Sequence, residues 1–89
     1  MTKRAHVVAR GRVQGVAFRA ELRGRARSLG LAGWARNNHD GSVEAAFEGA
    51  ADRVASLVDW CRHGPASARV DELELRWEEP CGDRGFEIR

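Results

Sequence analysis

The sequence predicts an α+β fold of the ferredoxin-like, split βαβ type, in which an antiparallel sheet carries two helices on one face. The first observation is the order of the elements, βαββαβ followed by one more short strand. The second is that the strand segments alternate apolar and polar residues, which suits a sheet with only one buried face. The third is that each helical segment carries a single apolar stripe, as a helix that rests on such a sheet requires.

The first third of the chain predicts a strand followed by a helix. Residues Ala5–Arg10 are β-branched in the middle and are followed by Gly11, as is typical of a short strand. Apolar residues at positions 18, 22, 26 and 29 follow the spacing of one helical face, which predicts a helix over Phe18–Leu29. Gly30 then stands where the glycine of a helix C-cap is commonly found.

A hairpin and a second helix are predicted next. The strand segments Trp34–Asn37 and Ser42–Glu48 flank Asn38-His39-Asp40-Gly41, and Asp-Gly between two strands is a strong hairpin signal. Over Asp52–His63, apolar residues recur at the spacing of one helical face, and Gly64-Pro65 ends the helix. The residues of this apolar face are Val54, Leu57, Val58 and Cys61.

Two more strand segments complete the chain. Apolar residues at positions 73, 75 and 77 alternate with charged ones, which indicates a strand with one apolar face. After Pro80 to Gly85, the run Gly85–Arg89 predicts a short terminal strand with apolar residues at positions 86 and 88. The positions of the three tryptophans are consistent with core packing, and we expect it for Trp34, Trp60 and Trp77.

Length and charge favour a small single-domain protein over a nucleic-acid-binding or membrane protein. The 89 residues suffice for one small hydrophobic core, so residues 1–89 are expected to form a single domain. The 15 Lys and Arg residues against 13 Asp and Glu leave a net charge of +2, too balanced for a dedicated nucleic-acid clamp. No apolar run approaches the roughly 18 residues that span a bilayer, and no secretion signal precedes the first strand. We therefore expect a cytoplasmic monomer without membrane or nucleic-acid partners.

The two cysteines, Cys61 and Cys81, form neither a disulfide framework nor the spacing of a zinc site. Both are expected to be reduced thiols, with a single bridge between them as the alternative. Cys61 falls on the apolar face of a predicted helix, which favours an inert, buried thiol. No metal site and no cofactor are predicted.

The most informative stretch lies between the first strand and the first helix, Gly11-Arg-Val-Gln-Gly15-Val-Ala-Phe-Arg19. Its two glycines let the backbone turn tightly and present N–H groups to a ligand. The stretch leads into a helix N-terminus, where unpaired N–H groups and the helix dipole favour an anion. Arg19 lies in the first helical turn, and its guanidinium offers two parallel donors that match two phosphate oxygens. This combination predicts a cradle for a phosphoryl group, although it has neither the ending of a Walker loop nor a dinucleotide fingerprint.

Asn37 is the second candidate site residue. It ends a strand that is expected to lie near the sheet centre and close to the first helix. Its neutral carboxamide offers one acceptor and two donors, which suits holding a water molecule. Considered alone, Asn37 is better explained as a hairpin residue, and Arg19 as one of a surface series with Arg23 and Arg27. His39, at the hairpin tip, is a less favoured candidate for a general base.

Taken together, these motifs resemble the acylphosphatase family. The resemblance rests on Gly11–Arg19, on Gly33-Trp-Ala-Arg-Asn37 and on Asp40-Gly41-Ser-Val-Glu44, and it extends to the closing Gly-Phe-Glu-Ile-Arg. It implies hydrolysis of the carboxyl–phosphate anhydride of a small-molecule acyl phosphate to a carboxylate and inorganic phosphate. It also implies that Arg19 binds the phosphoryl group and that Asn37 orients the attacking water. The remaining anion ligands would be the backbone N–H groups of Val13, Gln14, Gly15, Val16, Ala17 and Phe18.

These groups would suffice for the reaction that the resemblance implies. The leaving group of an acyl phosphate is a stable carboxylate, so no catalytic acid is needed. Fixed N–H donors and one arginine can stabilise the charge on the three equatorial phosphoryl oxygens without a metal ion. We expect direct in-line attack by water and no phosphoenzyme. Two departures from the family's usual residues, Ala17 and Ala35, should thin the packing around the site without removing its chemistry.

Two functions from other classes stay open. The chain could be a non-catalytic, anion-binding regulatory module that keeps the cradle without turnover. It could also be an RNA-binding ferredoxin-like domain, because such sheets with basic surfaces bind RNA. That function needs stacked aromatic residues on the open sheet face, whereas the sequence turns Glu44 and Glu48 away from the core residue Phe47.

Overall fold

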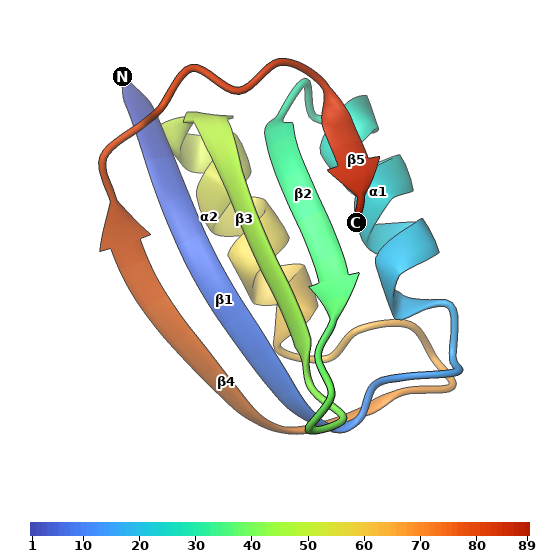
Figure 1. Ribbon diagram of the computed structural model, residues 1–89. Helices are drawn as coiled ribbons and strands as arrows, with labels where there is room; N and C mark the ends of the chain where they lie inside the picture. Colours follow the sequence, from blue (N-terminus) through green and yellow to red (C-terminus); the bar gives the residue numbers. More distant parts are fainter.

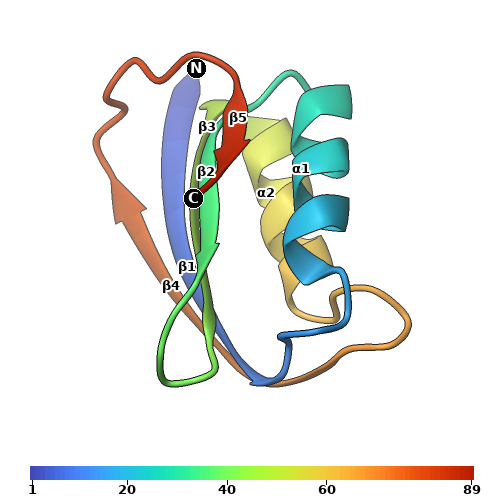
Figure 2. The ribbon, with the colours of Figure 1, turned by 45° about the vertical axis from the view of Figure 1, so that its right-hand side comes forward.

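The computed structural model describes residues 1–89 as five strands and two helices. The strands are β1 (Thr2–Arg12), β2 (Ala32–Asn37), β3 (Val43–Ala50), β4 (Arg69–Glu78) and β5 (Phe86–Ile88). The helices are α1 (Phe18–Ser28) and α2 (Ala51–Cys61). The strands form one sheet in the order β4-β1-β3-β2-β5. Both helices lie behind this sheet in Figure 1 and on one side of it in Figure 2, so the predicted fold is confirmed.

Strand β5 is the exception to the antiparallel pattern of the sheet. Strands β1 to β4 pair antiparallel with their neighbours, whereas β5 runs parallel to β2. After β4 the chain crosses the end of the sheet to its opposite edge (Figure 1). Strand β5 therefore runs opposite to β4 and in the same direction as β2.

The core lies between the sheet and the two helices. The residues of β1 and β3 that face the helices pair across the strands as Ala5 with Phe47, Val7 with Ala45 and Ala9 with Val43, and all are buried. The predicted apolar stripes are confirmed, since α1 buries Phe18, Leu22 and Ala26 and α2 buries Val54, Leu57, Val58 and Cys61. Neither helix has the length and hydropathy that a transmembrane span requires.

Helix α1 ends as the sequence indicates. Gly30 adopts a φ of 69°, in the left-handed region that favours glycine. Its N–H donates to the carbonyl of Arg27 at 3.1 Å, and the N–H of Leu31 donates to the carbonyl of Ala26 at 2.8 Å. These two bonds are those of a Schellman motif, which turns the chain from α1 directly into β2.

The open face of the sheet carries paired charges. On its central strands, Arg4 binds Glu48 at 2.7 Å between Nη1 and Oε1. On the same face, Nε2 of His6 lies 2.6 Å from Oε2 of Glu44. Trp34 also lies on this face and not in the core, since its neighbours Gly33 and Ala35 are the buried residues of β2. This face does not offer the aromatic platform on the central strands that the RNA-binding alternative requires.

The other two tryptophans also differ from the expected core positions. Trp77 is 51% exposed, because it lies on the edge strand β4 whereas α2 packs mainly against β1 and β3. The ammonium group of Lys3 lies 5.1 Å from its ring centroid. Trp60 is half-buried at the margin of the core, with its ring centroid 5.3 Å from that of Phe18. The alternation of residues in β4 correctly predicted that Trp77 lies on the apolar face of the strand. It could not show that no helix covers this position.

Candidate active site

A pocket of about 170 Å³ brings together the residues that the sequence singled out. It lies where β1 and β2 end and α1 begins, at the lower end of the sheet in Figure 2. Its volume is below the roughly 300–1,000 Å³ of sites for drug-sized ligands, so it suits a small group such as a phosphoryl unit. The lining residues are Val13, Gly15, Ala17, Phe18, Arg19, Ala20, Asn37 and Ile88.

The connection between β1 and α1 presents a row of unpaired backbone donors. None of the N–H groups of residues 14–20 donates a hydrogen bond to an acceptor in the protein. Ala17 is the N-cap of α1, and its side chain cannot cap the helix. The first turn of α1 therefore keeps its partial positive charge, which favours an anion in the adjoining pocket.

The backbone of this connection alternates in handedness. Gly15 has a φ of 76° and Ala17 a φ of 61°, whereas Val16 between them has a negative φ. Such alternation turns successive N–H groups toward a common point and forms an anion-binding nest. Ala17 is the only non-glycine residue with a positive φ, a conformation that costs about 1–2 kcal/mol for a residue with a Cβ atom. Backbone strain of this kind concentrates at functional sites.

Arg19 supplies a guanidinium that no acidic side chain engages. It lies half-buried in the first turn of α1, lines the pocket and takes part in none of the ion pairs of the protein. Arg27, from the surface series that was the alternative explanation, is exposed, donates to the carbonyl of Phe86 at 3.1 Å and does not line the pocket. Arg19 is thus the one arginine among the residues that line the pocket.

Asn37 lines the same pocket from the last position of β2. It pairs with Val43 of β3, and its side chain is exposed. Its carboxamide forms none of the side-chain hydrogen bonds of the hairpin, which belong to Asn38 and residues beyond it. Its donors and acceptor are therefore available to a ligand or a water molecule. His39 is exposed at the hairpin tip and does not line the pocket, so its position does not favour a general base.

Comparison with known proteins identifies the family of this chain. The family model for acylphosphatase matches residues 5–88. The chain belongs to the acylphosphatase family. An acylphosphatase from Roseiflexus sp. is 55% identical over 86 residues, which cover 96% of this chain and 92% of that protein. Another, from Rubrobacter xylanophilus, is 56% identical over 90 residues, which cover 99% of this chain and 81% of that protein.

Solved acylphosphatase structures have the same fold. The acylphosphatase from Coxiella burnetii superposes with a TM-score of 0.94 at 33% identity, over 99% of this chain and 93% of that one. The acylphosphatase from Bacillus subtilis gives a TM-score of 0.93 at 31% identity, over 100% of this chain and 99% of that one. These relatives identify the chain as an enzyme of the acylphosphatase type, a hydrolase with a ferredoxin-like fold.

Two residues of this acylphosphatase pocket were not predicted as site residues, Ala20 and Ile88. Ile88 comes from β5, which pairs with β2 so that Ile88 lies beside Ala35. The alternation at the end of the chain marked Ile88 as apolar, but no local pattern relates it to a loop near the other end. Only the parallel pairing of β5 with β2 brings Ile88 to the pocket.

Two predicted loop residues, Gln14 and Val16, are not among the residues that line the pocket. Val16 packs against the hydrophobic core. The Gln14 side chain is half-buried and does not enter the pocket. It instead forms hydrogen bonds with the hairpin, which are described below.

A hydrogen-bond network connects the side chains of the hairpin that follows Asn37. The hydroxyl and the N–H of Ser42 donate to Oδ1 of Asp40 at 2.6 and 3.0 Å, and Arg10 donates to Oδ2 at 2.9 Å. The Ser42 bonds and, after them, the Arg10 guanidinium hold the pKa of Asp40 well below its usual range. Nδ2 of Asn38 donates to the Ser42 hydroxyl at 3.0 Å. The chain immediately after Asn37 is thus held by hydrogen bonds among its own side chains and by Arg10 of β1.

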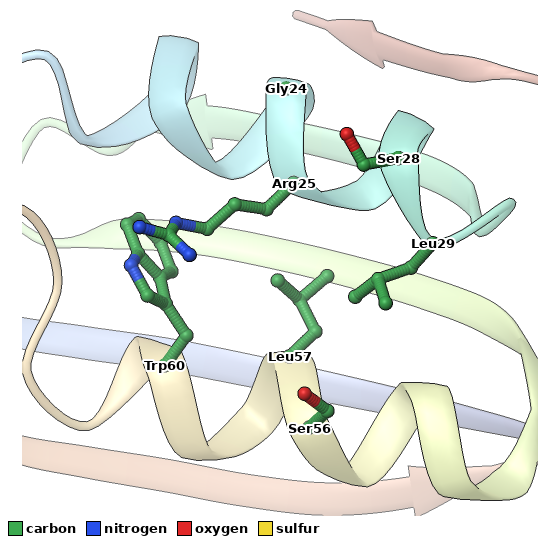
Figure 3. A pocket seen from close by; sticks show the side chains of 7 residues that line it. All are labelled: Gly24, Arg25, Ser28, Leu29, Ser56, Leu57 and Trp60. Carbon is green, nitrogen blue, oxygen red and sulfur yellow. The ribbon is translucent and has the colours of Figure 1, made fainter.

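A second pocket, of about 300 Å³, lies between α1 and α2. Figure 3 shows the Arg25 side chain reaching across it to Trp60, and the guanidinium carbon lies 4.9 Å from a ring centroid of Trp60. Its only charged group is therefore already stacked on an aromatic ring. The second pocket offers no row of N–H donors, so the first pocket is the better candidate for an anion site. Its lining residues are Gly24, Arg25, Ser28, Leu29, Ser56, Leu57 and Trp60.

Proposed function

We propose that this protein hydrolyses small-molecule acyl phosphates by direct in-line attack of a water molecule, without a metal ion. The observation that carries the proposal is that Arg19 and Asn37 line one small pocket beside the unpaired N–H groups of residues 14–20. A phosphoryl group bound there would lie between the backbone N–H donors of the loop and the carboxamide of Asn37 from β2. This is the set of groups that the reaction needs.

The loop and Arg19 would hold the phosphoryl group. Backbone N–H groups that already point to one place lose little freedom when an anion arrives, and they stabilise charge as it develops. The Arg19 guanidinium would contact two phosphoryl oxygens with parallel donors. In the loose transition state of phosphoryl transfer, charge spreads over the three equatorial oxygens, so these donors act where the charge is greatest.

Asn37 would hold the attacking water. A carboxamide accepts one hydrogen bond from the water and can donate another, which fixes the water without requiring a charge near the anion. Correct alignment of water and phosphorus accounts for much of the rate that such a site provides. The carboxylate leaving group needs no acid, and the phosphoryl oxygens of the substrate can accept the proton of the water.

The residues of the pocket support a metal-independent reaction. None of the lining residues carries a carboxylate, an imidazole or a thiol, the groups that bind divalent metals in proteins. The one group of potential ligands, Glu48, Cys81 and Asp83, lies at the other end of β3. There Nη1 of Arg4 already binds Glu48 at 2.7 Å and Asp83 at 3.0 Å, so a cation would have to displace a guanidinium.

Hydrolysis of benzoyl phosphate by the purified protein in metal-free buffer tests the proposed function. We expect the wild type to release benzoate and inorganic phosphate, and Asn37→Ala to do so far more slowly. Phosphate binding without turnover would favour the anion-binding regulatory module instead. RNA retention that decreases with salt would favour the RNA-binding alternative.

The proposal also covers the state of the protein in the cell. We propose a cytoplasmic monomer of a single domain, without nucleic-acid or membrane partners. The single core cluster, which joins both helices to β1, β2, β3 and β5, supports one domain, and the paired charges of the open face support the absence of an RNA partner. Sedimentation equilibrium measures the mass in solution, and a dimer would contradict the monomer.

A further inference from the structure

Gln14 joins the anion-binding loop to the hairpin that follows Asn37. Its Nε2 donates to the carbonyl of Asn38 at 2.8 Å and to the carbonyl of Ser42 at 2.9 Å. Because a carboxamide nitrogen has two hydrogens, both of its donors are used. Both partners are acceptors, so the orientation of the carboxamide is determined by them.

The two carbonyls belong to the residues that close the hairpin. The N–H of Asn38 donates to the carbonyl of Ser42 at 2.9 Å, and the N–H of Gly41 donates to the carbonyl of Asn38 at 3.2 Å. Gln14 therefore binds the hairpin at its narrowest point, next to the peptide group that links Asn38 to Asn37. Since no side-chain hydrogen bond holds Asn37 itself, the backbone that Gln14 fixes determines where its carboxamide lies.

No other side-chain hydrogen bond connects residues 13–17 to the hairpin. The loop has one more such bond, from the Ser67 hydroxyl to the carbonyl of Val16 at 3.3 Å, and it leads to the connection between α2 and β4. The ends of the loop are fixed in the core by Val13 and Phe18, which are 1% and 3% exposed. The shape of the loop thus depends on these anchors, whereas its distance from Asn37 depends on Gln14.

We propose that Gln14 is a positioning residue that sets the distance between the anion-binding loop and Asn37, so that the water faces the phosphorus in line. This inference rests on the proposed function. The Gln14 side chain acts through the hairpin backbone and touches neither the substrate nor the water. Loss of its side chain should therefore affect turnover more than anion binding.

Three substitutions of Gln14 test this. Gln14→Ala removes the donors, Gln14→Glu keeps the length but cannot donate when ionised, and Gln14→Asn is too short to reach both carbonyls. In each variant we expect kcat for benzoyl phosphate to fall roughly 10- to 100-fold, the scale of a small misplacement of reacting groups. In Gln14→Ala and Gln14→Asn the inhibition constant of inorganic phosphate should change by less than about threefold, because the lost side-chain bonds do not touch the anion. Ser67→Ala, which removes the other side-chain bond of the loop, is the matched control and should retain wild-type kcat.

A double variant separates positioning from a general structural role. If Gln14 acts through Asn37, Gln14→Ala should lower kcat little when Asn37→Ala is already present. Additive losses, a loss of phosphate binding as large as the loss of kcat, or wild-type kcat in Gln14→Ala would each overturn the inference. Thermal unfolding of every variant shows that it is folded at the assay temperature. A wild type that binds phosphate without hydrolysing benzoyl phosphate would overturn the proposed function, and this inference with it.

Discussion

Arg19 in the first turn of α1 and Asn37 at the end of β2 line the same pocket, although they belong to different layers of the fold. Helix α1 packs against β2 and β5, so its N-terminus lies beside the end of β2. The guanidinium and the carboxamide can therefore act on one small ligand. Because the two groups have different proposed tasks, their substitutions should have different kinetic effects.

Arg19→Lys should lower kcat for benzoyl phosphate roughly 100-fold or more, the scale seen when one transition-state donor is lost. The lysine keeps the charge but cannot make two parallel contacts with the phosphoryl oxygens. Steady-state kinetics measure the effect. Arg23→Lys, on the same helix but not in the pocket, should behave as the wild type. Near-normal turnover of Arg19→Lys would contradict the assigned role.

Asn37→Ala should lower kcat roughly 100-fold while the inhibition constant of phosphate stays nearly unchanged, because the carboxamide is assigned to the water. Comparing kcat with phosphate inhibition in one set of assays measures this difference. The matched control is His39→Ala, at the exposed hairpin tip, which should keep full activity. If His39→Ala lost activity instead, a general base at the tip would have to be reconsidered.

Chelation should leave the activity unchanged, since the pocket offers donors and a guanidinium but no carboxylate, imidazole or thiol to hold a divalent metal. The rate of benzoyl phosphate hydrolysis is measured before and after dialysis against EDTA. Readdition of Mg²⁺ or Zn²⁺ serves as the control. An activity that disappears with EDTA and returns with a metal would require a different mechanism.

Glu48→Gln should lower the free energy of unfolding by roughly 1–3 kcal/mol at pH 7. Glu48 is buried and accepts bonds from Arg4 at 2.7 Å and from the N–H groups of Cys81 and Gly82, each at 3.0 Å. These bonds fix the connection that crosses the sheet to β5. The decrease in the free energy of unfolding should be smaller than for breaking an isolated buried ion pair, because Arg4 keeps its ion pairs with Glu78 and Asp83.

The effect of Glu48→Gln should depend on pH. Burial alone would raise the pKa of Glu48, but the Cys81 N–H and the Arg4 guanidinium outweigh it and lower the pKa from its ordinary 4.5. A carboxylate with a lowered pKa stabilises the folded protein fully when the pH is above its pKa in the unfolded chain. This stabilisation is lost as the pH falls through its pKa in the folded protein. Urea unfolding should therefore show a difference between wild type and variant that shrinks below pH 4.5. Glu79→Gln, exposed in the same connection, is the control, and a difference independent of pH would contradict this role of Glu48.

The two thiols should react differently with a disulfide reagent such as DTNB. Burial raises the pKa of Cys61 to about 12, and its side chain is inaccessible. Cys81 is exposed, but partial desolvation of its thiol and the nearby acceptors Asp83 and Glu48 raise its pKa, so it should react slowly at neutral pH and faster at alkaline pH. Absorbance of the released thiolate should show Cys81 alone reacting in the native protein and both thiols in denaturant. Rapid reaction of Cys81→Ala would show that Cys61 is accessible in solution.

The sequence correctly predicts the apolar faces of both helices and the place of the proposed anion-binding loop, because each depends on residues close together in the chain. Leu22 and Leu57 lie buried where the helical spacing indicates, and Gly30 ends α1 as expected. The left-handed conformation of Ala17 gave no such signal, since alanine has no preference for it. The alternation of backbone handedness that this conformation gives the loop was therefore visible only in the structure.

By itself, the sequence determined the order of elements, the apolar faces of both helices and the resemblance that led to Arg19 and Asn37. The tertiary structure alone decided that Trp77 lies uncovered, that Ile88 reaches the pocket from a parallel strand and that Gln14 binds the hairpin. The physical reason is the range of the interactions. Periodicity and turn chemistry act over a few residues, whereas contacts between distant segments depend on how the whole sheet is assembled.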